Sequence, residues 1–205
     1  MKQRADTRER ILQTAILLFW ERGYAESTLA DLMARAEVNS GSFYYFFKSK
    51  ENLLLAVLER YKEMLHSVLL APIWEKISDP IERVFGLLAR YREAVVMTGC
   101  TYGCPIGRLA MEVAPEMGAV HALIAANFEG WSTAVRECLE MARDRLPQGI
   151  DLVRLSRFVL TVMEGGVMQS RSYRSVEPFD QAVEQLRDYF DRLLAEGAAQ
   201  RQAQI

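Results

Sequence analysis

The sequence has no long hydrophobic run, few cysteines and no excess of charge of either sign. In 205 residues no uninterrupted apolar stretch approaches the roughly 20 residues of a membrane-spanning helix, so no membrane association is expected. No apolar segment follows the charges of the first ten residues, so no signal peptide is expected either. Half of the residues are hydrophobic and the formal net charge is −2, values that argue against a disordered chain. These features predict a globular protein of the cytoplasm.

Residues suited to metal binding or catalysis are scarce. The three cysteines, Cys100, Cys104 and Cys138, are too few and too unevenly spaced for a disulfide framework. The first two form a C-x₃-C pair that lacks the other two ligands of a zinc site, so no metal is expected. His66 and His121 lie far apart, and no Ser-His-Asp set or phosphate-binding glycine loop accompanies them. We therefore predict no cofactor and no enzymatic activity, and an α-helical enzyme remains a distant alternative.

The hydrophobic periodicity is helical throughout. Over 7–22 apolar residues recur at the 3.6-residue spacing of an amphipathic helix, and Gly23 follows as a helix terminator. Thr28 with Asp31 three places later is the pattern of a capping box, which predicts a second helix. No strand-like alternation is present, so the fold class is all-α. Further helices are predicted from Ser40 to Phe46 or Phe47, from Ser49 to a stop at Pro72, over 80–96, from Pro105, from Pro115 to about Leu146, over 151–169, and from Pro178 to about Glu196, followed by a frayed polar tail.

The stretch V-N-S-G-S-F-Y-Y-F-F-K-S-K-E-N-L, residues 38–53, places five aromatic residues between small polar residues and two lysines. Two short helices joined by a tight turn, the second starting with small residues, form a helix-turn-helix, whose second helix enters the major groove of DNA. The first 62 residues carry a net charge of +2 and the rest −4, so the N-terminal part is the one suited to a polyanion. We expect Phe43 and Phe47 to face the core and Tyr44 and Tyr45 to face outward.

The first third of the chain resembles the TetR family of transcriptional repressors over about residues 7–58. The matching segments are R-E-R-I-L-Q-T-A-I-L-L-F-W-E-R-G-Y and S-T-L-A-D-L-M-A-R-A-E-V-N-S-G-S-F-Y-Y-F-F-K-S-K-E-N-L. The resemblance implies a homodimer that binds double-stranded operator DNA. It also implies phosphate contacts from Ser27, Thr28, Tyr44, Lys48 and Lys50, and base or groove-rim contacts from Asn39, Ser40, Gly41, Ser42 and Tyr45.

Two positions depart from the pattern of this family. Glu37 occupies the turn position that is usually glycine, so the turn is expected to differ slightly. Phe46 stands where the family often has histidine, which removes one phosphate donor.

The remainder of the chain would form the ligand-sensing body. We expect a DNA-binding domain over residues 5–65, with its helix-turn-helix at about 28–47, and a ligand-sensing and dimerisation domain over 66–205. The resemblance implies that the last two helices pair with those of a second copy, and that a small molecule releases the protein from DNA. The segment G-C-P-I-G-R-L-A-M-E-V, with E-G-G-V-M-Q-S-R later, looks like one subgroup of the family. Candidate ligand-binding residues are Tyr91, Tyr102, Arg108, Phe128, Trp131, Met163 and Glu164, each of which is otherwise a core residue.

Cys104 supports an alternative mode of regulation. Pro105 at the first helical position places Cys104 at a helix N-cap, where backbone N–H groups and the helix dipole favour a thiolate. A thiol-based redox or electrophile sensor acting through Cys104 is therefore an alternative to a ligand-responsive repressor, and a packed cysteine is the simpler interpretation. The alternative from another class is a helical ligand-carrier or interaction protein that does not bind DNA.

Overall fold

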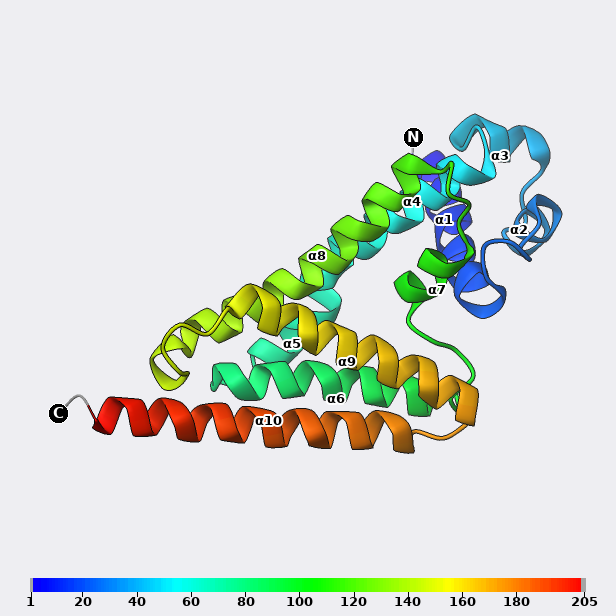
Figure 1. Cartoon of the computed structure of the whole chain (residues 1–205). Coiled ribbons are helices and arrows are strands. Elements are labelled where there is room, and N and C mark those ends of the chain that lie inside the picture. The colour runs from blue at the N-terminus through cyan, green and yellow to red at the C-terminus, as the bar shows by residue number, and fades with distance from the viewer. Residues whose placement is uncertain (1, 204–205) are drawn as a thin grey trace. The chain divides into compact units, whose positions relative to one another are not determined.

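The computed structural model describes residues 2–203, with side chains from residue 5, and in that range it consists of helices and no strands (Figure 1). The all-α fold class is confirmed. Contacts divide the chain into two units, one of residues up to 63 with 104–127 and one of 64–103 with residues from 128 onward. The sequence-based boundary at 65/66 lies close to residues 63/64, where the chain first passes from one unit to the other. Residues 104–127, however, group with the N-terminal segment.

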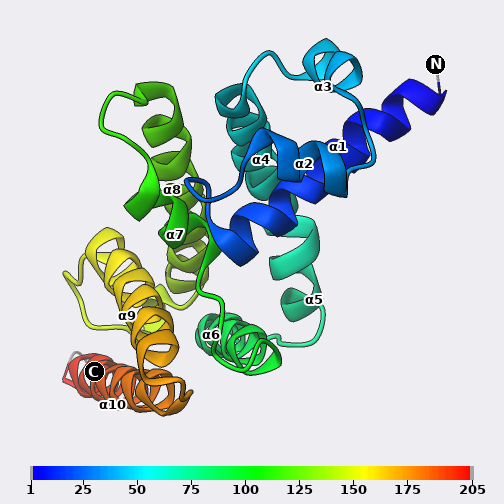
Figure 2. The same cartoon turned by 90° about the vertical axis from the view of Figure 1, so that its right-hand side faces the viewer.

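The first unit is a small helical head. Ile11, Leu32, Phe43 and Leu54 come from four different helices and are fully buried in one core. Burying an aliphatic or aromatic side chain contributes about 1.5–3 kcal/mol, so such a core fixes the helices against each other. The helices of this unit are α1 (Lys2–Arg22), α2 (Leu29–Arg35), α3 (Ser40–Phe46), α4 (Lys50–Met64), α7 (Pro105–Glu112) and the first part of α8 (Gly118–Met141) (Figure 2).

The ends of these helices follow the local sequence. Gly23, with φ of 95°, comes directly after α1, and Thr28 with Asp31 forms the predicted capping box at the start of α2. The Ser49 hydroxyl accepts the N–H of Asn52 at 3.0 Å at the start of α4. Each of these groups satisfies backbone atoms that a helix end leaves without a partner. The predicted end of the first helix at Gly23 and the predicted caps at Thr28 and Ser49 are confirmed.

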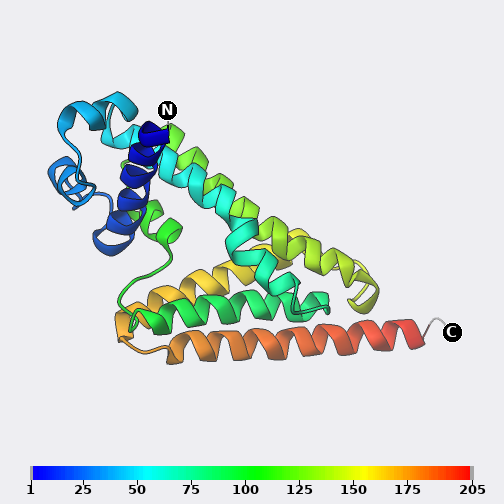
Figure 3. The same cartoon turned by 180° about the vertical axis from the view of Figure 1, so that it is seen from behind.

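The second unit is built around three long helices that lie side by side: α6 (Pro80–Met97), α9 (Leu152–Tyr173) and α10 (Glu177–Gln202) (Figure 3). Leu88, Val159, Phe179 and Phe190 are buried between them, and the Phe85 and Phe190 rings meet edge to face with centroids 5.4 Å apart. The smaller elements of the unit are a π-helix (Leu65–Leu70), α5 (Ala71–Trp74), the second part of α8 and a 3₁₀ turn (Arg143–Arg145).

Several boundaries differ from the sequence-based prediction. α1 begins at Lys2 rather than at residue 7, α8 ends at Met141 rather than at about Leu146, and α9 continues to Tyr173 rather than ending at Gln169. The helix before Pro72 does not stop there, because a π-turn leads into α5, where Pro72 lies in the first turn and needs no N–H donor. α8 begins at Gly118 rather than Pro115. The predicted frayed tail is wrong as far as Gln202, where α10 ends, and the last two residues of that predicted tail lie outside the described residues. The Gln200 side chain accepts the N–H of Gln148 at 2.7 Å and Arg201 donates to the carbonyl of Asp144, which holds this last part of the helix.

The turn between α2 and α3 keeps a left-handed residue although it lacks glycine. Glu37 has φ of 52°, and the N–H of Val38 donates to the carbonyl of Met33 at 3.0 Å, which closes the end of α2. Arg10 of α1 donates from Nε to the carbonyl of Ala36 at 2.8 Å, which holds the turn against α1. The expected slight difference in the turn is therefore small.

We expect Glu37→Gly to raise the free energy of unfolding by about 0.5–1 kcal/mol. A left-handed conformation costs a residue with a Cβ about 1–2 kcal/mol, and the extra flexibility of glycine in the unfolded chain offsets part of this gain. Urea unfolding measures the difference. The matched control is Glu137→Gly at an exposed helical position of α8, which should lower stability by about 1 kcal/mol. Equal losses in both variants would contradict the assignment of strain to Glu37.

Candidate nucleic-acid interface

The turn of residues 36–39 sets α3 as the second helix of a helix-turn-helix. The side chain of Asn39 caps α3 by accepting the N–H of Ser42 at 2.8 Å. A cap of this kind stabilises a helix by about 1 kcal/mol, which matters for a helix of only seven residues. Asn39 was expected to face bases, and the structure gives it this structural role, which occupies its amide oxygen.

The aromatic run on α3 divides between two faces. Phe43 is fully buried and Phe47 is 3% exposed, whereas Tyr44 and Tyr45 are 45% and 59% exposed. The Phe43 and Phe47 rings pack within the head with their centroids 6.2 Å apart. The prediction that these two phenylalanines face the core and that Tyr44 and Tyr45 face outward is confirmed. The Tyr45 and Phe46 rings pack edge to face with their centroids 4.8 Å apart, and this contact limits the orientations open to the tyrosine side chain.

Small residues begin the exposed side of α3. Ser40 and Gly41 are exposed and Ser42 is half-buried. A Cβ on Gly41 would approach only the Asn39 amide oxygen, at 3.5 Å, so the backbone here is open to a close neighbour. A helix with this profile can approach the floor of a major groove.

Two lysines follow α3 and have different surroundings. Lys48 is exposed, and its ammonium donates to the carbonyl of Tyr44 at 3.2 Å. The Lys50 ammonium lies 4.3 Å from the centre of the Tyr24 ring and donates to the carbonyl of Ala25 at 3.5 Å. Burial lowers the pKa of Lys50, and the carboxylates of Glu112 and Glu26 oppose that shift. Lys50 is thus held at the corner between α1 and α2.

Ser27 and Thr28, which precede α2, also differ in their surroundings. Thr28 is exposed, and its hydroxyl lies 2.7 Å from the carboxylate of Asp31 within the capping box. Ser27 is fully buried, and its hydroxyl donates to the carbonyl of Gly23. The expected phosphate contact from the Ser27 hydroxyl is therefore corrected, because this donor is used inside the head.

The expected ligand-binding residues do not all fall in one unit. Tyr91 and Trp131 meet edge to face in the second unit, with ring centroids 6.2 Å apart, and Met163 is buried there as well. The indole Nε1 of Trp131 is buried and has no hydrogen-bond partner. Arg108 belongs to the first unit and donates to backbone carbonyls of α1. Tyr102, Phe128 and Glu164 are half-buried residues of the second unit.

The cysteines differ in their surroundings. Cys104 is the N-cap of α7, as expected, and its sulfur accepts the N–H of Gly107 at 3.5 Å. Burial raises the pKa of the Cys138 thiol to about 11, so this cysteine stays protonated at neutral pH.

Among the described residues no three His, Cys, Asp or Glu side chains are grouped to hold a metal ion, and none of the described helices is long and apolar enough to cross a membrane.

Three charged side chains support the interface: Arg10 and Glu112, which the sequence did not single out, and Arg108, which was expected to bind a ligand. Arg10 bonds the turn before α3, and Arg108 and Glu112 of α7 bond the corner after α1. The i,i+4 spacing of Arg108 and Glu112 suggests an ion pair, which forms at 2.6 Å. Their backbone partners lie 86 to 88 residues earlier, and no local pattern could have identified them.

Comparison with known proteins agrees with this geometry. A sequence profile of bacterial regulatory proteins of the tetR family matches residues 11–57, and a profile of the tetracyclin repressor-like C-terminal domain matches residues 80–186. The HTH-type transcriptional repressor DhaR of Mycobacterium sp. (strain GP1) is 29% identical over 185 residues, which cover 87% of this chain and 89% of DhaR.

Solved structures have the same fold. A TetR transcriptional regulator from Chloroflexus aurantiacus is 26% identical and superimposes with a TM-score of 0.81, covering 93% of this chain and 97% of that chain. The reduced form of NemR from E. coli is 24% identical with a TM-score of 0.76, covering 89% of this chain and 96% of that chain. The likeness to NemR concerns the fold alone.

Proposed function

The chain belongs to the TetR family of bacterial regulatory proteins, and from this premise we propose that it is a dimeric repressor released from operator DNA by a small molecule. The observation that carries the proposal is the division of α3, with Phe43 and Phe47 in the core and Tyr44 and Tyr45 on the surface. A carrier protein has no need for an exposed tyrosine pair beside small residues and lysines. The relatives are transcriptional regulators, and a regulator of bacterial DNA works in the cytoplasm.

We assign roles by the chemistry of each exposed group. Thr28, Tyr44, Lys48 and Lys50 offer hydroxyl or ammonium donors for phosphate oxygens, which position the protein without reading sequence. The start of α3 faces base edges, with Ser40, Gly41, Ser42 and Tyr45 as the contacts. Asn39 contributes through its cap, which fixes the first turn of α3.

The salt dependence of DNA binding tests the proposal. A duplex selected by the wild-type protein from a random-sequence library serves as the operator. Each neutralised phosphate contributes about −0.9 to the slope of log affinity against log salt concentration. Lys48→Ala should therefore weaken binding to all sequences and flatten the slope by about one unit per head.

The matched control is Lys62→Ala, an exposed lysine on α4 that pairs with Glu59 at 3.8 Å and lies outside the proposed interface. Its slope should equal that of the wild type. If the library yields no enriched duplex, or if both variants keep the wild-type slope, the DNA-binding proposal fails.

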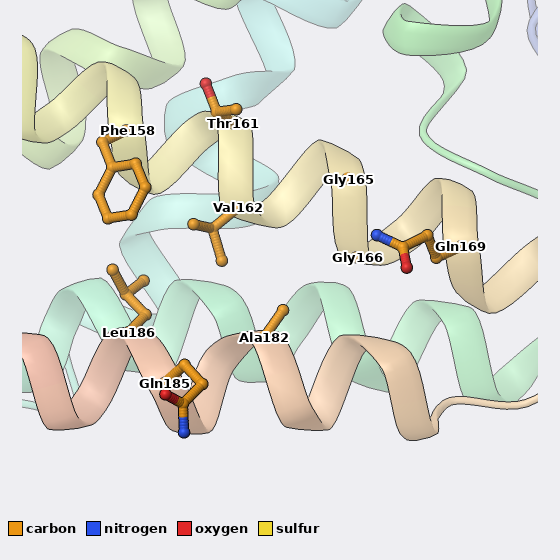
Figure 4. A pocket seen from close by; sticks show the side chains of 9 residues that line it. All are labelled: Phe158, Thr161, Val162, Gly165, Gly166, Gln169, Ala182, Gln185 and Leu186. Carbon is orange, nitrogen blue, oxygen red and sulfur yellow. The ribbon is translucent and has the colours of Figure 1, made fainter.

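TetR regulators act as dimers, and we propose that the dimer forms through α9 and α10. A groove runs between these two helices, lined by Phe158, Val162, Gly165, Ala182 and Leu186 among others (Figure 4). Phe158, Met168 and Tyr173 are 46%, 64% and 72% exposed along α9, an apolar surface that a second copy would cover. Gly165 has nothing within 4 Å of where a Cβ would stand, which leaves room for a close helix.

We expect Ala182→Arg to break the dimer, because it places a charge in this groove. Light scattering after size-exclusion chromatography should report a monomer. Operator affinity should fall by about a hundredfold or more, since the second head no longer binds within the same complex. Ala195→Arg, at an exposed position of α10 outside the groove, should leave the dimer intact. A dimeric Ala182→Arg protein would contradict this interface.

For the effector we propose an apolar molecule with a hydrogen-bond acceptor, bound in the second unit beside Tyr91 and Trp131. A buried N–H without a partner costs about 1–3 kcal/mol, so Nε1 of Trp131 is a donor suited to a ligand. Tyr102, Phe128, Met163 and Glu164 of the same unit are the further candidates. A second candidate is a thiol sensor at Cys104, favoured by the Gly107 N–H that points at its sulfur, and one relative was solved in a form described as reduced.

One pair of variants separates the two modes of release. A thermal-shift screen of small aromatic compounds should yield compounds that raise the Tm of the wild type and release it from the operator. The same compounds should neither raise the Tm of Trp131→Phe nor release that variant, whereas Cys104→Ser should respond as the wild type does. Under thiol-based regulation, diamide should release the wild type and Trp131→Phe but not Cys104→Ser. Cys138 should stay unmodified, because its thiol pKa is about 11. A wild type that releases DNA under neither treatment would contradict both modes.

A further inference from the structure

The corner between α1 and α2 is held by two charged side chains from α7. Arg108 donates from Nη1 to the carbonyls of Trp20 and Glu21, each at 3.2 Å, and from Nη2 to the carbonyl of Arg22. The last carbonyls of a helix have no partner inside the helix, and a guanidinium with several donors in one plane suits them. Its positive charge also complements the C-terminal end of α1.

Glu112 binds the other side of the same corner. Its Oε2 accepts the N–H of Tyr24 at 2.6 Å and that of Ala25 at 3.4 Å, while its Oε1 accepts the Nε proton of Arg108 at 2.6 Å. The side chains of Arg108 and Glu112 are only 14% and 21% exposed. We call Arg108, Glu112 and the backbone of 20–25 the corner clamp.

Gly23 shows how closely the two segments approach. A Cβ at this position would overlap the carboxylate of Glu112 and stand 2.6 Å from Nη2 of Arg108. Its φ of 95° also favours glycine. The corner therefore needs glycine for two separate reasons, its own conformation and the approach of α7.

The corner clamp is adjacent to two of the proposed phosphate contacts, Thr28 and Lys50. Three residues after Ala25 comes Thr28, the N-cap of α2, so the position of the corner sets where α2 begins. Lys50 donates to the carbonyl of Ala25 and lies over the ring of Tyr24, whereas Glu112 accepts the N–H groups of the same two residues. Glu112 and Lys50 thus bind the same short backbone segment, one through its N–H groups and the other through a carbonyl.

We propose that Arg108 and Glu112 are positioning residues for DNA binding: they fix the α1–α2 corner, and Arg108 keeps the carboxylate of Glu112 from neutralising Lys50. The inference rests on the proposed DNA-binding function. With Arg108 in place, the charge of Glu112 is balanced by a guanidinium at 2.6 Å. Without it, the ammonium of Lys50, which binds the backbone of Ala25 as Glu112 does, would pair with this carboxylate, and that ion pair would compete with a phosphate contact. The chain enters the first unit at Cys104, directly before α7. Because α7 carries Arg108 and Glu112, a displacement of α7 would alter the backbone of the corner and the contact of Lys50 with it.

Operator affinity and its salt slope, measured with the full-length protein, test this proposal. Arg108→Met keeps an apolar stem, leaves Glu112 unpaired and should lower affinity about tenfold while flattening the slope by about one unit per head. Arg108→Met with Glu112→Gln removes the competing charge, so the slope should return to that of the wild type although the affinity stays reduced. Arg108→Lys should keep the slope and lose affinity, since one ammonium cannot serve three carbonyls.

The control is Arg143→Met, which breaks an exposed Arg–Glu pair with Glu140 at 2.7 Å in the second unit and should change neither quantity. Thermal unfolding identifies a variant that fails to fold, and in that case the double variant, which leaves no unpaired charge, carries the test. Lys50→Ala, which removes the ammonium itself, should flatten the slope as Arg108→Met does. The proposal is overturned if both variants keep the wild-type slope and Arg108→Met also keeps the wild-type affinity. An affinity loss with an identical slope in all three variants of the clamp would overturn the charge competition. If the wild type itself binds no duplex, the proposed function fails rather than the clamp.

Discussion

The burial of Phe43 and Phe47 is the constraint on which the function of the head depends. α3 has only seven residues, and a helix so short does not form by itself in water. Two rings in the core and the Asn39 cap hold it in place. Because its inner face is committed to the core, the residues on its outer face are fixed in direction. A short helix with a small-residue start, two exposed tyrosines and adjacent lysines is the arrangement that can enter a major groove.

Charge has a second role in the same head, because it joins segments that are distant in sequence. Arg60 of α4 binds Glu9 of α1 with bonds of 2.6 and 2.8 Å, and these hydrogen bonds lower the pKa of Glu9 to about 2. Arg108 and Glu112 connect α7 to the end of α1 in a less exposed setting. Partly buried groups of this kind are costly to leave unpaired, so each link favours one arrangement of the helices.

The sequence predicted best what local chemistry decides. Gly23 after α1 and the Thr28–Asp31 box at α2 need only neighbours within a few residues, and both were identified correctly. The C-terminal part of α10 was missed because its support comes from Gln148 and Asp144, which are distant in sequence. The partners of Arg108 were missed for the same reason, whereas the inward hydroxyl of Ser27 has a local partner, the carbonyl of Gly23, and was missed because the resemblance to the family placed it at phosphate. The effector residues could not be separated from core residues, since both use buried aromatic and apolar side chains.

Hydrogen–deuterium exchange of the dimer with and without its selected operator duplex tests most directly that the outer face of this head is the DNA-binding surface. The account predicts slower exchange in peptides covering 25–31 and 39–50 on addition of the duplex, with α9 and α10 unchanged. A binding duplex that protects only α9 and α10, or leaves 39–50 unaffected, would contradict it.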